Sequence, residues 1–246
     1  MVNGRAAADA IARARRLPTL RVGLHLALVD AAPSLPCDEL PDLVNRDGCL
    51  RTDLAKLGFD VFLRPRPRRQ MAAEIEAQFN AYQLSGLSLD HVNAHHHFHL
   101  HPTIGALIVD IGKRYGLRAV RVPAEPGRVL DRIEPLGKPH RDPFIAPWTA
   151  LLRKRVRARG LAVTDHVFGR AWSGAMSEAR VAGILEHLPD GISEMYLHPA
   201  TVDRFAGAVP GYRYMDELAA LVSPRVKALA AKCGARRGGF ADVLPA

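Results

Sequence analysis

The chain has 246 residues, 48% of them hydrophobic and 24% charged, which suits a globular protein with a sizeable core. No apolar run reaches the roughly 20 residues of a membrane span, and the first residues lack the apolar segment of a secretory signal. The three scattered cysteines form no CxxC pair, so we expect reduced thiols and a cytoplasmic protein. The net charge of +9 favours acidic partners, but no nucleic-acid-binding motif accompanies it.

Helices and strands are expected to alternate along the chain. In order, we predict a helix over 5–16, a buried strand over 20–29, an irregular proline-rich segment over 30–69, a helix over 70–86, a strand over 87–94, a helix over 102–116, a strand over 117–123, a long loop over 123–145, helices over 147–160 and 176–191, a strand starting at 192, a helix over 224–234 and a short tail. This alternation predicts an α/β fold, in which residues 87–122 form a parallel crossover unit. A barrel and an open doubly wound sheet both agree with it.

Histidines crowd one short segment, DHVNAHHHFHLHP, which spans residues 90–102 and holds six of the 11 in the chain. The strand before it is expected to end at Ala94, and the next helix to begin at Pro102. His95 and its neighbours should therefore lie at the carboxyl end of a strand, where α/β folds build their sites. Imidazole is a common ligand of divalent metals, so the segment favours a metal site. A hydrogen-bonded histidine loop without metal is the alternative.

Two further histidines occupy similar positions. His25 lies near the end of the strand over 20–29, and His198 follows the strand that starts at residue 192. Three strands thus each place a histidine at the same rim, which strengthens the prediction of a site.

Several stretches resemble the YdjC-like carbohydrate deacetylases: LDHVNAHHHFHLHP, VGLHL, YLHPA, GLRAVRVPAEP and DHVFGRAWSGAMSE. Within that family they are most similar to the hopanoid-biosynthesis-associated HpnK branch. The resemblance covers essentially the whole chain and implies a single domain over 1–246 with a distorted TIM-like (β/α) barrel. It also implies removal of an N-acetyl group from an amino sugar, with the N-acetylglucosaminyl headgroup of a hopanoid lipid, or an oligosaccharide, as substrate.

The resemblance further implies one divalent ion, Mg or Zn, held by one Asp and two His. Motif matching places the two histidines at His25 and His95. His198 is expected to protonate the leaving nitrogen, with a structural strand-end histidine as the alternative. Substrate contacts are expected from His97, His99, Arg121, Asp165 and His166. A buried ion pair at Arg121, and a simple turn at residues 165 and 166, would produce the same sequence pattern.

One departure from the family is large, because no TADDFG-like motif, the expected source of the metal-binding Asp and the general base, occurs in these residues. We therefore expect the first strand–helix–strand unit to be missing, through a misplaced start or a truncation, and the chain as given to be inactive and prone to aggregation or dimerisation. A sugar- or metal-binding relative without activity is the alternative. A third hypothesis, that of a nucleic-acid-binding protein, rests on net charge alone.

The predicted helix over 147–160 is basic and begins near Trp148. Such a helix can lie on an anionic bilayer, which would place the protein peripherally at the inner face of the membrane, over a glycolipid headgroup. An ordinary surface helix, with its apolar face on the core, is the alternative.

Overall fold

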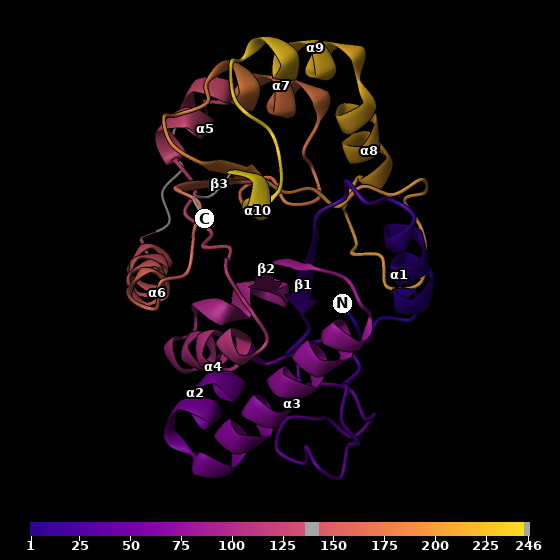
Figure 1. The fold of residues 1–246 in the computed structure, drawn as a ribbon, viewed down its shortest axis with the longest axis vertical. Coiled ribbons are helices and arrows are strands. Elements are labelled where there is room, and N and C mark those ends of the chain that lie inside the picture. The colour runs from indigo at the N-terminus through magenta and orange to yellow at the C-terminus, as the bar shows by residue number, and fades with distance from the viewer. Residues whose placement is uncertain (136–142, 244–246) are drawn as a thin grey trace. The chain divides into compact units, whose positions relative to one another are not determined.

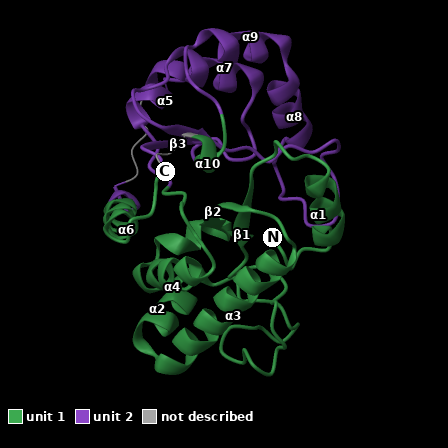
Figure 2. Ribbon diagram, in the orientation of Figure 1, with its two compact units in different colours: residues 1–122, 147–163, 238–246 green, residues 123–146, 164–237 purple. Residues whose placement is uncertain are grey.

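The computed structural model describes residues 1–135 and 143–243, which divide into two compact units (Figure 2). Unit 1 comprises Met1–Val122, Pro147–Val163 and Gly238–Ala246, and unit 2 comprises Pro123–Ala146 and Thr164–Arg237. Part of the predicted loop over 123–145, residues 136–142, lies outside the described residues.

Unit 1 is built on a parallel pair of strands, β1 (Val22–Leu26) and β2 (Leu89–Ala94). Two isolated parallel bridges, Val92↔Val120 and Ala119↔Ala162, continue the pairing beyond β2. The predicted crossover over 87–122 is therefore confirmed as parallel, although its second strand is reduced to bridge residues. Both ends of this crossover reach the core, because Val92 and Val120 are almost completely buried, as is Leu24 of β1.

The helices of unit 1 are α1 (Ala7–Arg15), α2 (Leu54–Leu63), α3 (Pro65–Leu84), α4 (Pro102–Arg114), most of α6 (Ala146–Ala158), the short α10 (Phe240–Val243) and the 3₁₀ helix η1 (His95–Leu100). Figure 1 shows α3 and α4 together on one side of the β1–β2 pair. The predicted helical face of α3 is confirmed, because Met71, Ile75, Phe79 and Tyr82 are all buried. Gly86 and Gly116 have left-handed backbones after α3 and α4, as expected of helix-ending glycines.

The prediction of an irregular segment over 30–69 is wrong in its second half. Helix α2 and the first turn of α3 occupy it. Leu57 and Val61, one helical turn apart, face the core of unit 1 and stabilise α2 by burial. Pro65 and Pro67, which suggested a loop, lie in the first turn of α3, where a missing backbone N–H costs nothing.

A polar row on α3 holds the chain that follows β1. Gln78 bonds both the N–H and the C=O of Ala27, at 2.9 and 2.7 Å, and Glu74 accepts the N–H groups of Ser34 and Leu35. Gln70, one turn earlier, accepts the N–H of Asp42 at 2.9 Å. The row satisfies backbone groups that have no strand partner, which fixes the path of the loop containing Asp30.

Unit 2 has its own parallel pair, β3 (His166–Phe168) and β4 (Ser193–Met195). Its helices are α5 (Gly127–Ile133), α7 (Glu178–Glu186), α8 (Tyr214–Val222) and α9 (Pro224–Lys232), of which Figure 1 shows α5, α7 and α9 together on one side of β3. A separate core, including Phe168, Trp172 and Ile184, holds them. The predicted cap at Ser177 is confirmed, because its side chain accepts the N–H of Arg180. Strand β3 and helices α5 and α8 were not predicted.

The α/β class is confirmed, but the expected TIM-like barrel is not. Within the described residues the named strands form two separate two-stranded sheets, and no sheet closes on itself. A barrel requires each strand to be paired on both sides, whereas β1 pairs with β2 alone in the described part of the chain. No helix in residues 1–135 and 143–243 has both the length and the hydropathy needed to cross a membrane.

Candidate active site

The histidine segment begins where β2 ends and has an unusual backbone. Residues 95–100 form η1, inside which His96 and His97 adopt left-handed conformations, with φ of 52° and 53°. Asp30, in the loop after β1, has φ of 49°. In the described chain these are the only residues other than glycine with positive φ. Each such conformation costs on the order of 1 kcal/mol or more, and strain of this kind gathers at functional sites.

Two of these strained residues take part in a cluster of metal-type donors. Asp30, His95 and His96 each offer one ligand atom, and the three atoms lie within 4.8 Å of one another. His96 Nε2 is 3.6 Å from Asp30 Oδ2, and the His95 and His96 ring centroids are 4.1 Å apart. The backbone of Asp30 is anchored, because its N–H donates to the carbonyl of Arg51 at 3.2 Å.

His25, on β1, lies beside this cluster. Its ring centroid is 5.7 Å from that of His95, and its Nδ1 contacts Oδ1 of the buried Asn93. Burial lowers the pKa of His25 from 6.5 to about 3, so the ring is neutral near pH 7. With Nδ1 donating to Asn93, the lone pair remains on Nε2, which is the form that binds metals.

These residues fit a divalent cation. Neutral imidazole is a ligand of borderline metals, and a mixed set of imidazoles with one carboxylate suits Zn better than Mg, which prefers oxygen. The predicted pair, His25 and His95, is brought together in unit 1. His95 also belongs to the converging set with Asp30 and His96, neither of which was predicted as a ligand.

His99 has a different environment from His95. It is 1% exposed, and its Nε2 donates to the carbonyl of Arg121 at 2.9 Å. Burial lowers its pKa well below the usual value. Its Nδ1 is buried without a hydrogen-bond partner among the described residues. His99 therefore ties η1 to the segment that follows α4, and the ring of His97 lies beside it, with centroids 5.9 Å apart.

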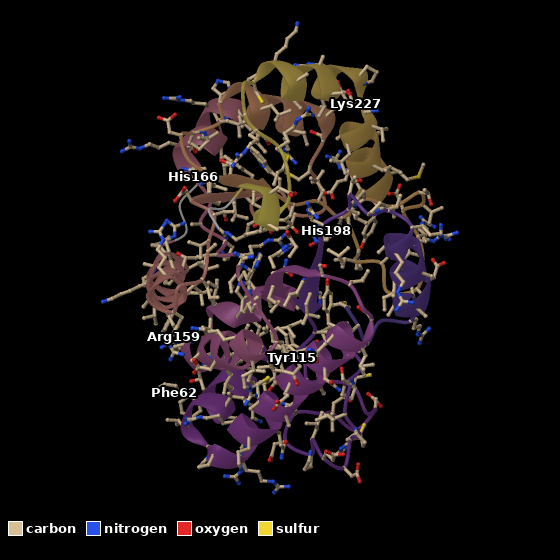
Figure 3. All side chains as sticks on the ribbon, viewed as in Figure 1. Phe62, Tyr115, Arg159, His166, His198 and Lys227 are labelled. Carbon is tan, nitrogen blue, oxygen red and sulfur yellow. The ribbon has the colours of Figure 1, made fainter. Side chains whose placement is uncertain are left out.

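His198 is in unit 2, in the segment after β4, and is marked in Figure 3. Its side chain is 40% exposed, and its Nδ1 lies 3.9 Å from Oε2 of Glu217, which is fully buried. The same carboxylate oxygen accepts the backbone N–H of His198, and Oε1 accepts that of Met176 at 3.0 Å. The ring of Tyr212 flanks the imidazole, with centroids 5.2 Å apart.

Asp165 and His166, also in unit 2, are bonded to the backbone of one turn. Asp165 Oδ2 accepts the N–H of Ile192 at 3.0 Å, and His166 Nε2 lies 3.2 Å from the carbonyl of Asp190. Gly191 is left-handed, and a side chain there would meet the Asp165 carboxylate at 2.7 Å. Both side chains thus hold the turn that leads into β4.

Three residues with buried or clustered polar contacts were not among the site residues predicted from the sequence. Asn93 and Asp30 contact the histidines, and Glu125 of unit 2 accepts the N–H groups of Gly169 and Ala171 at 2.9 and 2.8 Å. Burial raises the pKa of Glu125. Asn93 was findable, because it lies within the histidine segment. Asp30 had no local signal, because it lies in an irregular loop far from that segment in the sequence.

The chain is similar in sequence and in fold to several known proteins. The chain is 26% identical to a carbohydrate deacetylase of Geobacillus stearothermophilus over 237 residues, which are 95% of this chain and 80% of that protein. It is 28% identical to a chitooligosaccharide deacetylase of Enterobacter sp. (strain 638) over 249 residues, covering 99% and 86% of the two chains. A solved structure of a candidate cellobiose-phosphate cleavage protein from Enterococcus faecalis V583 has the same fold, with a TM-score of 0.73 at 21% identity over 99% of this chain and 85% of that chain.

The family model described as YdjC-like protein matches residues 1–232. Because this match spans nearly the whole chain of 246 residues, the chain belongs to the YdjC-like protein family.

Proposed function

We propose that this protein is a metal-dependent carbohydrate deacetylase that removes the N-acetyl group of an amino sugar. The observation that carries the proposal is the cluster of His25, His95, His96 and Asp30 at the carboxyl end of the β1–β2 pair. Its support is the family membership and the similarity to proteins named carbohydrate and chitooligosaccharide deacetylases.

The cluster would hold one divalent ion through His25 and His95, with Asp30 and His96 as further donors. Such an ion, when bound, polarises an amide carbonyl and lowers the pKa of a bound water. The chain itself supplies neutral imidazoles, because burial keeps His25 unprotonated. It also supplies the carboxylate of Asp30, which is 58% exposed and therefore accessible from solvent.

The amine leaving group must be protonated as the C–N bond breaks. We propose His198 for this role, because its imidazole is accessible and the buried carboxylate of Glu217 lies against it. His97, His99, Arg121, Asp165 and His166 are retained as candidates for substrate contact. Of these, His99 is the least suited, since its ring is buried and bonded to the backbone.

The N-acetylglucosaminyl headgroup of a hopanoid lipid is the finer substrate proposal, with membrane contact through α6. Trp148 and Leu151 are 46% and 38% exposed in the first half of this helix, while Leu152 and Val156 face the core. Not all of the cations in and just after α6 are available to lipid, because Arg155 donates to the carbonyl of Pro102 and Arg159 pairs with Asp110. This engagement favours a soluble oligosaccharide over a glycolipid as the first substrate to test.

The test is release of acetate from N-acetylglucosamine oligosaccharides and from an N-acetylglucosaminyl lipid in vesicles, each with added Zn²⁺ or Mg²⁺. A His95→Ala variant is the negative control. Metal-dependent release that the variant lacks supports the deacetylase. Stoichiometric metal binding and saturable sugar binding without release would instead identify a binding protein. Release from the lipid alone would establish the finer proposal.

A further inference from the structure

We propose that α10, near the C-terminus, and three side chains of β2 set the tautomer of His25. The side chains are Asp90, His91 and Asn93, which form a directed chain of hydrogen bonds from α10 to His25. The proposal deepens the metal-dependent function, on which its consequence for metal binding rests. The hydrogen bonding itself is independent of any activity.

The series of hydrogen bonds starts at Asp90, which is 6% exposed. Its carboxylate accepts the backbone N–H groups of Phe240 and Ala241, at 3.0 and 2.9 Å, across about 150 residues of sequence. The same carboxylate lies 2.9 Å from Nδ1 of His91. An ionised carboxylate only accepts hydrogen bonds, so the hydrogen in this contact belongs to His91 Nδ1.

His91 is held so that its second nitrogen faces Asn93. The ring stacks on Phe240, with centroids 4.5 Å apart and an interplanar angle of 24°. Gly23 also lies against this ring, because an added Cβ there would come within 2.5 Å of it. A neutral imidazole that donates from Nδ1 accepts at Nε2, and Nδ2 of Asn93 lies 3.3 Å from that atom.

Asn93 connects His91 to His25, because its amide donates a hydrogen bond on one side and accepts one on the other. Its Nδ2 is used toward His91, which leaves Oδ1 to face Nδ1 of His25. Since Oδ1 only accepts, His25 must carry its hydrogen on Nδ1 and its lone pair on Nε2. Asn93 is 6% exposed, so water does not readily replace either contact.

This relay, the hydrogen-bonded series Asp90–His91–Asn93–His25, links the start of β2 to its carboxyl end. His95 and the other metal-type donors lie at that end. It explains why a short helix near the C-terminus docks on a buried aspartate rather than on an apolar surface alone. Outer hydrogen bonds of this kind select the metal-binding nitrogen of a histidine, and losing one lowers metal affinity by roughly 10- to 100-fold. Asp90, His91 and Asn93 are thus positioning residues for His25.

The experiment reads the tautomer directly, by long-range ¹H–¹⁵N NMR of the metal-free, ¹⁵N-histidine-labelled chain. In the unmodified chain His25 is expected as the Nδ1–H form. In Asp90→Asn, the new amide can donate to His91 Nδ1 and reverse every bond after it, which shifts His25 toward the Nε2–H form. In Asn93→Asp, the carboxylate still accepts from His25, so the Nδ1–H form is retained.

The double variant Asp90→Asn with Asn93→Asp separates the relay from general damage. It carries both changes, yet it is expected to restore the Nδ1–H form that Asp90→Asn alone loses. Competition for Zn²⁺ should show about 10-fold weaker binding in Asp90→Asn than in the double variant. Loss of the Nδ1–H form in both proteins overturns the relay. If Asp90→Asn fails to fold by circular dichroism, or keeps the Nδ1–H form because its amide oxygen faces His91, Asn93→Leu replaces it. That change removes the acceptor of the His25 Nδ1 hydrogen, so an unchanged His25 tautomer there overturns the proposal.

Discussion

The histidine segment of unit 1 and the strand-end residues of unit 2 look alike in sequence but differ in what they contact. In unit 1, His25 and His95 lie beside each other and beside Asn93, His96 and Asp30, all through side chains. In unit 2, Asp165 and His166 are bonded to backbone groups of one turn. A polar residue after a strand is therefore ambiguous until its partners are known.

The comparison separates two uses of the same residue types. A side chain bonded to a nearby turn replaces a backbone hydrogen bond and stabilises the fold. Side chains that meet across strands, on a backbone with left-handed residues, maintain an arrangement that costs stability. The second pattern is the one expected of a binding site.

A fall in pH is expected to have the largest effect, which is a loss of folding stability through His25 of unit 1. Burial lowers the pKa of His25 from 6.5 to about 3. Between pH 6.5 and pH 3 its imidazole is therefore protonated in the unfolded chain and neutral in the folded chain. Stability is then fully present above about pH 6.5 and is lost as pH falls toward 3. Relative to His25→Gln, the unmodified metal-free chain should lose about 3 kcal/mol more between pH 6.5 and 4. Urea titrations of both proteins measure this, and parallel pH profiles would show that His25 titrates normally.

Replacement of His95 should have the next largest effect, because this residue belongs to both the predicted pair and the observed donor set. We expect His95→Ala to weaken Zn²⁺ binding by on the order of 100-fold, beyond the usual effect of a residue that only supports a ligand. Isothermal titration and elemental analysis measure it. His187→Ala is the matched control, because that imidazole lies in unit 2 and its Nδ1 donates to the Gly183 carbonyl at 2.9 Å. Equal occupancy in the two variants would place the metal elsewhere.

Asp165→Ala should affect stability rather than binding. It removes the acceptor of the part-buried Ile192 N–H, and a typical intramolecular hydrogen bond contributes about 0.5–1.5 kcal/mol. Thermal unfolding should therefore shift, while Zn²⁺ affinity and oligosaccharide binding stay unchanged. If sugar binding is lost instead, with unfolding unaltered, Asp165 belongs to a substrate site and the contrast between the two regions disappears.

The smallest effect is expected from glycine at the left-handed positions. His96→Gly and His97→Gly should each raise the free energy of unfolding by roughly 0.5–1 kcal/mol, the relief of strain less the greater backbone entropy of glycine. Only His96 belongs to the donor set, so only His96→Gly should also weaken Zn²⁺ binding, by about 10-fold. Chemical denaturation and metal competition check both. A gain in stability from neither variant would mean that the left-handed backbone stores no strain.

The positions of the histidine segment and its flanking elements could be predicted because they depend on local chemistry. Pro102 starts α4 and Ala94 ends β2 as expected, since a proline suits the first helical turn and apolar spacing defines a strand. The buried face of α3 followed in the same way from residues one turn apart. Helix α2 was missed because its arginine- and proline-rich neighbour resembles a loop when tertiary burial is unknown.

The sequence by itself determined the α/β class, the ends of α1, α4 and α9 to within two residues, and the location of His25 and His95 at strand ends, because each follows from neighbouring residues. Only the tertiary structure decided which polar groups meet. Asp30 lies near His96 because of the path of an irregular loop. His25 contacts Asn93, 68 residues away in sequence, and Asp90 accepts the N–H of Phe240, 150 residues away. These contacts depend on strand register and on how distant segments pack, and no local pattern of residues encodes the distance between two side chains that far apart in the chain.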